Sequence, residues 1–349
     1  MKRVLIALAV TMSCCVLAGC KKIYHEPEVS GFNSEGASMA LFSVAPDRQV
    51  RFSRGNLQYN PKSNKWRFAE HQYNIIGKDN RNISANYDGW IDLFGWGTSG
   101  CNWGSTAYQP WSTSTTASDY FTERGDNDLT GEYAQGDWGV HNAITNGGNQ
   151  AGKWRTLTAE EWRYLVSSNQ EGPRHNRCCM AKIKFGLPMG DRSDEYDGYM
   201  GYENSGEIYG LIILPDNWTR PSSLNNLLID PAESEYGPFI NRLRYDLEGW
   251  HALEEAGAVF LPMTMYREGN VVNEAPGDPN SWCGWTEPNG LYWSSTCANS
   301  ECAKAFQLFY WRKVDGNPYF LDSWSSVLQK AIGDKEGHLG LAVRLVQDR

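Results

Sequence analysis

Short runs of apolar residues in the last third of the chain predict the strands of a β-rich core. Residues 290–296 place Tyr292 and Trp293 directly after Leu291, and this density of β-forming side chains is typical of a buried strand. The runs at 303–311 and 340–346 have the same character. The pattern therefore predicts three strands near the C-terminus, and the first of them ends in the polar residues Ser-Ser-Thr.

Alternation with a period of two predicts further strands nearer the start of the chain. Residues 50–53 and 57–59 flank a glycine turn, and residues 65–68 alternate polar and aromatic side chains before an apolar continuation at 72–77. We expect these segments to form an antiparallel meander. In the middle of the chain, the runs at 180–185 and 209–214 predict a strand pair around an acidic insertion.

Helical signals are few, and the strongest lies between residues 154 and 166. Thr158 and Glu161 have the spacing of a capping box, and Trp162, Leu165 and Val166 form an inward stripe. Two shorter helical pieces are expected between residues 238 and 256. The second, residues 250–256, is stopped by Gly257.

Residues 87–148 show no lasting period and are rich in Gly, Ser, Thr and Asn. This tryptophan-rich segment contains Trp90, Trp96, Trp103, Trp111 and Trp138. A long irregular stretch inside a folded body is often a binding loop. Disorder is the alternative, but so many indole rings can bury enough apolar surface to offset the cost of ordering the chain.

The first residues predict export and lipid attachment. Lys2 and Arg3 precede an apolar run that is shorter than the about 20 residues needed to cross a bilayer, and residues 17–20 resemble a bacterial lipobox. We expect residues 1–19 to be a signal peptide, Cys20 to carry lipid, residues 20–41 to be a flexible tether, and residues 42–349 to form one domain. The alternative is an uncleaved membrane helix with an incidental cysteine.

Charge and cysteine content narrow the class of protein. The formal charge of −9 becomes −11 when Lys2 and Arg3 are removed with the signal peptide, so a nucleic-acid partner is not expected. Six cysteines then remain besides Cys20, and their spacing fits no zinc motif and does not fix their pairing: Cys101, Cys178, Cys179, Cys283, Cys297 and Cys302.

Several segments resemble a known family. The segment from Trp154 to Trp162 resembles the Trp-Arg-Leu-Pro-Thr-x-x-Glu-Trp motif of C-type-lectin-like domains, although Thr156-Leu157 stands where Leu-Pro is common. Residues 258–267 resemble that family's Phe-Leu-Pro-Ala-x-Gly-Tyr-Arg segment. With the three strands near the C-terminus, residues 153–346 are similar to the bacterial branch that includes the Fibrobacter succinogenes major paralogous domain and, distantly, the formylglycine-generating (sulfatase-modifying factor) enzymes.

This resemblance implies an α+β, C-type-lectin-like fold. Its expected features are antiparallel sheets, one or two packed helices, long irregular loops and a β-rich N-terminal elaboration. It also implies a cell-envelope lipoprotein of the outer membrane that recognises a glycan or a surface protein in adhesion and is not an enzyme. Two alternatives stay open. One is a copper enzyme of the formylglycine-generating type that uses Cys297 and Cys302, and the other is a structural part of a surface assembly such as a pilus tip.

Two acidic motifs are candidates for calcium, and no other cofactor is expected. Asp126, Asp128, Thr130 and Asp137 place oxygen ligands at positions like those of a calcium loop, although a solvated acidic turn is the simpler interpretation. Glu287 and Asn289 flank Pro288 in the tripeptide with which C-type lectins hold calcium and sugar, but the partner Trp-Asn-Asp motif is missing.

The ligand is expected to contact exposed rings on two loops, the tryptophan-rich segment and residues 267–289. Trp103, Trp111, Trp282 and Trp285 are the ligand-binding candidates because polar and small residues surround them. Glu287 and Asn289 lie on the second of these loops. The alternative is that these tryptophans belong to the core.

Overall fold

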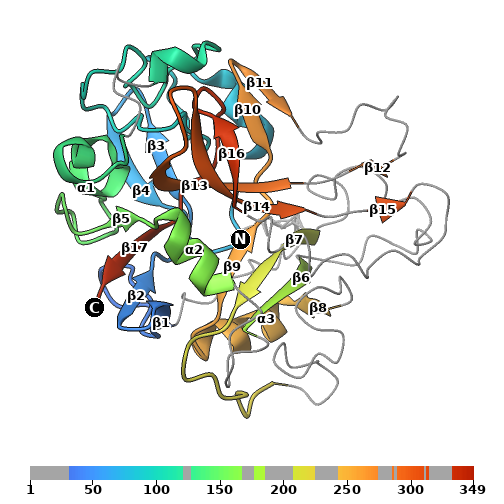
Figure 1. Ribbon diagram of the computed structural model, residues 1–349. Coiled ribbons are helices and arrows are strands. Elements are labelled where there is room, and N and C mark those ends of the chain that lie inside the picture. Colours follow the sequence, from blue (N-terminus) through green and yellow to red (C-terminus); the bar gives the residue numbers. More distant parts are fainter. Residues whose placement is uncertain are drawn as a thin grey trace, which may run out of the picture.

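The computed structural model describes residues 31–120, 127–166, 177–184, 207–224, 243–273, 285–286, 289–309, 312–313 and 332–349. Over these residues the protein is mixed but rich in strands, with several antiparallel sheets and few helices (Figure 1). The α+β class expected from the sequence is therefore found. None of the helices in the described ranges is long and apolar enough to cross a membrane.

Three larger sheets form the framework. The first has the order β1 (Phe42–Ala45), β2 (Arg48–Phe52), β17 (Leu345–Asp348) and β5 (Arg155–Thr156). The second has the order β8 (Leu243–Asp246), β6 (Cys178–Lys184), β7 (Glu207–Ile213) and β9 (Val259–Pro262), in which only β6 and β8 run parallel. The third consists of β13 (Asn289–Cys297), β14 (Cys302–Phe309) and β16 (Ile332–Glu336).

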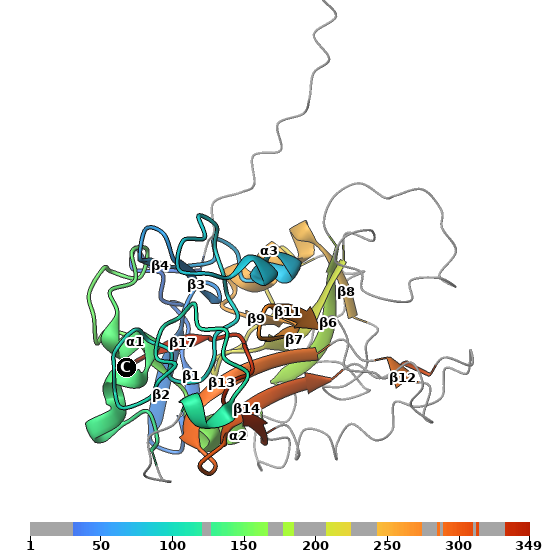
Figure 2. The same cartoon turned by 90° about the horizontal axis from the view of Figure 1, so that it is seen from above.

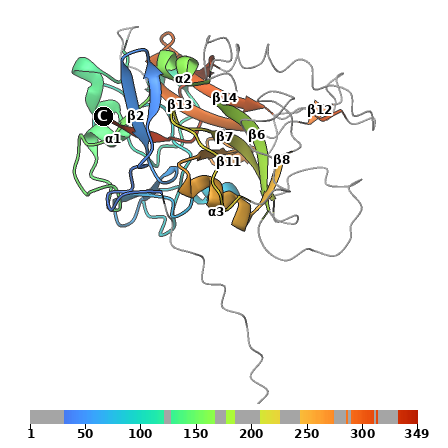
Figure 3. The same cartoon turned by 90° about the horizontal axis from the view of Figure 1, so that it is seen from below.

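Smaller pairs and short helices complete the described elements. The pairs are β3 (Leu57–Asn60) with β4 (Lys65–Phe68), β10 (Tyr266–Glu268) with β11 (Val271–Asn273), and β12 (Trp285–Thr286) with β15 (Arg312–Lys313). The helices are α1 (Trp138–His141), α2 (Ala159–Val166) and α3 (Leu247–Glu255), with 3-10 turns η1 (Gly77–Asn82), η2 (Ala117–Tyr120) and η3 (Gly131–Gly136). Viewed from above and from below, α2 lies against the β13–β14 hairpin and α3 lies beside the sheet that contains β6 and β8 (Figures 2 and 3).

Helix α2 confirms the strongest helical prediction. The Thr158 hydroxyl accepts a hydrogen bond from the Glu161 backbone N–H at 3.1 Å, and the Glu161 carboxylate accepts one from the Thr158 N–H at 2.9 Å. This reciprocal pair is the capping box. Trp162 is fully buried and its ring stacks on Phe306, with centroids 4.8 Å apart. The predicted apolar stripe of the helix therefore faces inward, and in the structure Trp162 packs on the β13–β14 hairpin.

The strands predicted at four places in the second half of the chain are also found. The strands expected at 180–185 and 209–214 are the antiparallel pair β6–β7, and those at 290–296 and 303–311 are β13–β14. Gly257 ends α3 with a φ of 94°, a left-handed conformation that glycine adopts without strain. Asp246 caps the start of that helix by accepting a hydrogen bond from the Gly249 N–H at 2.8 Å.

The predicted meander of β2 and β3 and the predicted single strand at 340–346 are both wrong, because the C-terminal segment pairs with several parts of the chain. The strands β2 and β3 are not neighbours, because the C-terminal segment pairs with both: the Ser53 N–H donates to the Leu345 carbonyl and the Leu57 N–H to the Val343 carbonyl, each at 2.9 Å. The predicted strand at 340–346 is correspondingly divided. Residues 340–342 make isolated bridges to three different segments, and only β17 is a strand.

Three local expectations also differ from the structure. Residues 72–77 form a turn leading to η1, in which the Asn74 side chain accepts from the His71 N–H at 2.8 Å. Residues 243–246, expected in the first helical piece, are strand β8, because they pair in parallel with β6. Residues 31–41, expected in the tether, pack on the body. There Ala37 is fully buried, and the Ser38 N–H donates to the Phe52 carbonyl at 2.8 Å.

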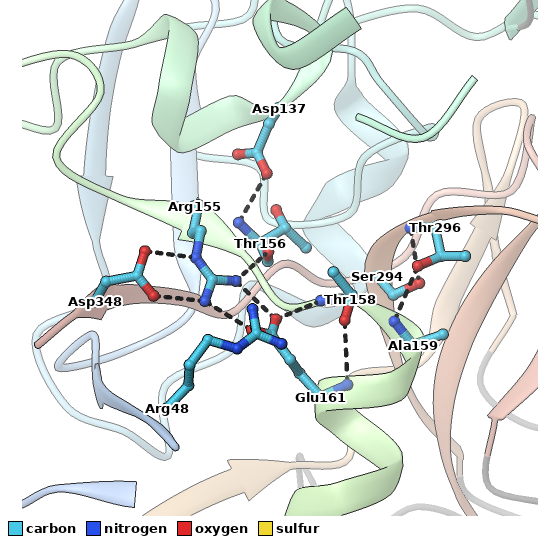
Figure 4. A network of polar contacts seen from close by, with 10 residues as sticks. All are labelled: Arg48, Asp137, Arg155, Thr156, Thr158, Ala159, Glu161, Ser294, Thr296 and Asp348. Atoms are coloured by element: carbon cyan, nitrogen blue, oxygen red, sulfur yellow. Dashed lines mark hydrogen bonds and ion pairs between the residues drawn. The ribbon is translucent and has the colours of Figure 1, made fainter. Parts of the chain in front are cut away.

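An ionic network around the buried side chain of Glu161 fixes α2 to the first sheet (Figure 4). The side chain of Glu161 is 1% exposed and accepts two hydrogen bonds from Arg155, at 2.7 and 2.8 Å. Arg155 also binds Asp348 at 2.6 Å, and Arg48 approaches Glu161 at 3.2 Å. Although burial alone would lower the pKa of Arg155, its hydrogen bonds to Asp348 and Glu161 raise it above the ordinary value. This network joins β2, β5, β17 and α2 at one point.

Candidate functional site

The tryptophan-rich segment is held to the body by buried rings and close backbone contacts. Trp96 and Trp138 are fully buried, and the Trp96 indole N–H donates to the Ser294 carbonyl on β13 at 2.8 Å. Gly97 adopts a φ of 72°, and a Cβ there would lie 2.4 Å from the Trp103 ring, so only glycine fits. The described part of this segment therefore has one fixed path despite its irregular backbone.

A buried arginine connects this segment to the β10–β11 hairpin. Arg267 is 0% exposed, and its guanidinium donates to the backbone carbonyls of Gly269, Leu93 (3.3 Å) and Ser112 (3.4 Å). Burial lowers its pKa to about 10. Among the described residues no carboxylate makes an ion pair with Arg267, so backbone carbonyl dipoles stabilise its charge. A charge solvated in this way constrains every segment that supplies a carbonyl.

We define the loop junction as residues 108–115 together with the hairpin formed by residues 266–273. The two parts touch, because a Cβ on Gly269 would lie 3.2 Å from the Thr115 methyl group. Three half-buried aromatic residues of the junction pack on the core beneath it, and they are Tyr108, Trp111 and Tyr266. Val271, on the same hairpin, is 58% exposed. Figure 1 shows β10 and β11 beside the loops drawn in teal.

The loop junction includes one of the predicted ligand-binding residues and excludes another. Trp111 is half-buried within it. Trp103 lies elsewhere and is only 9% exposed, with its ring edge-on to Trp96 at 5.7 Å and to Tyr133 at 5.8 Å. The exposure expected of Trp103 is therefore not found, because nearby glycines leave room for the ring to enter the core.

The remaining ligand-binding candidates are described only in part. Trp282 and Glu287 lie outside the described residues. For Trp285 and Asn289 the structure describes the backbone alone, in β12 and at the start of β13 respectively. Tyr108, Tyr266 and Arg267 were not predicted as site residues. Tyr108 is three residues before Trp111 and also has small and polar neighbours in the sequence. The pattern that indicated Trp111 could therefore have indicated Tyr108 as well.

The candidate calcium residues make protein contacts. Asp137 is 1% exposed, and its two oxygens accept from the N–H groups of Gly139 (2.9 Å) and Thr156 (2.8 Å), so it caps α1 and holds β5 (Figure 4). Asp128 accepts from the Cys297 N–H at 2.7 Å, whereas Thr130 is exposed. Asp126 lies outside the described residues. Within the described ranges no group of three or more His, Cys, Asp or Glu side chains is placed to hold a metal ion.

Cys297 and Cys302 lie at the turn end of the β13–β14 hairpin, where β13 ends and β14 begins. The Cys302 carbonyl accepts from the Ala298 N–H at 2.8 Å, which closes the turn between the two strands. Burial raises the pKa of the Cys302 thiol, and the charges of Asp334 and Glu336 raise it further. This environment disfavours the thiolate that copper(I) binding requires.

Comparisons with known proteins do not add to this description. No protein-family model, curated protein or solved structure matches the chain.

Proposed function

We propose that this protein is an envelope lipoprotein, attached through lipid on Cys20, that recognises a glycan or a surface protein without catalysing a reaction. We further propose that its body is an elaborated C-type-lectin-like domain of the outer membrane. The observation that carries the proposal is the loop junction, where buried Arg267 fixes the tryptophan-rich segment to the β10–β11 hairpin and half-buried rings remain partly open to solvent.

The physical advantage of such a site is preorganisation. Binding normally costs free energy because loops and side chains lose freedom when they contact a ligand. At the loop junction, Arg267 and the packing of Tyr108, Trp111 and Tyr266 on the core already restrict that freedom. Rigid aromatic rings of this kind are frequent at the centres of binding sites.

The environment of the cysteine pair supports a binding protein over a copper enzyme. Burial and the charges of Asp334 and Glu336 raise the pKa of the Cys302 thiol, so its thiolate forms less readily than that of an ordinary cysteine. The environment of Cys302 therefore supports the proposed binding function over the alternative of a copper enzyme.

The binding surface is tested with Trp111→Ala and Tyr266→Ala in the detergent-solubilised full-length protein. We expect each variant to weaken binding to a glycan-array ligand by about 1 to 3 kcal/mol, because a ring that contacts the ligand is lost. Tyr164→Ala on α2, which also removes a half-buried ring, serves as the control and is expected to bind normally. Unchanged binding in both junction variants, or a large loss of thermal stability in both, would count against the loop junction as the site.

The membrane attachment has a separate test. Cys20→Ala is expected to release the protein from the membrane fraction, because the residue that carries the acyl chains is absent. Fractionation followed by a carbonate wash measures this. A variant that stays with the membrane would show that another feature anchors the chain.

A further inference from the structure

The β3–β4 hairpin has one apolar face and one polar face. Tyr59 pairs with Trp66 across the hairpin and with Ile91 on its other side, and all three side chains are buried in the core. Because successive side chains of a strand point to opposite faces, the next positions lie on the other face. We call it the polar hairpin face, and it carries Gln58, Lys65, Arg67 and Trp90.

Arg67 is held in a fixed orientation on the polar hairpin face. Its Nε donates to the side-chain oxygen of Gln58 at 2.8 Å, and Gln58 is itself only 2% exposed. The guanidinium carbon lies 3.8 Å from the centre of the half-buried Trp90 ring, a cation–π contact. Among the described residues neither terminal nitrogen of Arg67 has a hydrogen-bond partner. Gln58 and Trp90 therefore fix the orientation of the Arg67 guanidinium. Its two terminal nitrogens are available to donate hydrogen bonds to a ligand.

A second cation lies on the same face. Lys65 is two residues before Arg67 on β4, which places their Cα atoms about 7 Å apart. Lys65 is exposed and makes no ion pair with any carboxylate in the described ranges. Lys62, on the turn of the same hairpin, instead binds Asp88 at 2.6 Å. Burial lowers the pKa of Arg67, and the charge of Glu70 opposes this effect. Within the described residues neither Arg67 nor Lys65 makes an ion pair with a carboxylate, which is notable in a chain with a net charge of −9.

The strand edges around this face are already occupied, which limits the kind of ligand. The Trp66 carbonyl accepts from the Thr145 N–H at 2.9 Å, and the Asn146 side chain binds both backbone groups of Phe68. On the other side, β3 is bridged to Ile91. A peptide therefore cannot add as a further strand, the usual way in which an extended peptide binds a sheet. The groups left over on Arg67 and Lys65 are donors, so they fit a ligand rich in acceptor oxygens.

We propose that Arg67 and Lys65, beside Trp90, form a binding site for an acidic sugar such as a uronic acid. The planar donors of Arg67 match a carboxylate, and Lys65 donates to a second oxygen of the ligand. This inference rests on the proposed function in glycan recognition and names one class of sugar. The polar hairpin face is separate from the loop junction, so each site can be tested by itself.

The test compares an oligogalacturonate with its methyl ester, which has the same sugar rings but no carboxylate charge. Binding to the detergent-solubilised full-length protein is measured by calorimetry. We expect the acid to bind at least about tenfold more tightly than the ester, because hydrogen bonds to a charged group are stronger than those to a neutral one. Arg67→Gln is expected to remove this preference, and Arg67→Lys to retain part of it. Lys65→Gln is expected to weaken the acid about threefold, as for loss of one exposed charge contact.

Lys62→Gln is the matched control, because it removes one positive charge from the same hairpin but one that Asp88 already neutralises. We expect this variant to bind the acid like the wild-type protein, and melting curves check that all four variants fold. Equal affinity for acid and ester, or equal effects of Arg67→Gln and Lys62→Gln, would overturn the inference. Tighter, Arg67-dependent binding of an aspartate-rich peptide would overturn it in favour of a protein partner.

The outcomes also separate this inference from the proposed function. If neutral glycans bind through Trp111 without preference for the acid, the acidic-sugar site alone is wrong. If the wild-type protein binds neither glycans on the array nor either oligomer, glycan recognition fails as a whole.

Discussion

Replacing Glu161 with alanine is expected to lower the free energy of unfolding by about 3 kcal/mol, because it removes a buried carboxylate that accepts charged hydrogen bonds and completes a capping box. The Arg155 guanidinium would lose two of its hydrogen bonds, and Thr158 would lose the acceptor that completes the capping box. Arg48 would lose its ion pair as well. Urea unfolding followed by tryptophan fluorescence measures the change.

The neighbouring residue provides a matched control. Glu160 is also a helix glutamate, but its side chain is 81% exposed and its partner Arg163 is on the surface. Glu160→Ala is expected to change the free energy of unfolding by less than about 0.5 kcal/mol. If the two alanine variants were equally stable, the network around Glu161 would not contribute as described.

Trp162→Ala is expected to cost about 4 kcal/mol, since removing a large buried ring loses its burial and leaves a cavity. The ring is 0% exposed, stacks on Phe306 and approaches Phe52 at 6.2 Å between centroids. It therefore joins α2 to both the first and the third sheets. Trp162→Phe retains an aromatic ring and is expected to cost clearly less. A Trp162→Ala variant that unfolds at the wild-type urea concentration would show that these sheets do not depend on the ring.

The sequence predicted those features that depend on residues close together in the chain. The capping box of Thr158 and Glu161 needs only a spacing of three, and the β13–β14 hairpin needs only two apolar runs joined by a short turn. Both signals are present in the local pattern. The structure confirms the capping box and both strands of this hairpin.

Features that join distant segments could not be predicted in this way. Arg344 is fully buried and donates to the side-chain oxygen of Gln72 at 2.8 Å, yet the two residues are 272 positions apart. The contact of Arg267 with Ser112 and that of Arg67 with Trp90 likewise depend on the tertiary fold. The pattern of apolar residues does not show that an arginine is buried or which ring it contacts. The arginine contacts on which both proposed sites depend therefore emerged only from the structure, although the sequence had already indicated Trp111.

The position of β17 has a consequence for how the chain acquires its structure during synthesis. This strand lies between β2 and β5, and its residues are almost 300 positions later in the chain than those of β2. Until residues 345–348 leave the ribosome, β2 has an unpaired edge that can bind other strands. Pairing across such a long separation is also slow. Newly made chains therefore depend on protection of this edge, and a chain truncated before residue 345 would keep it permanently open.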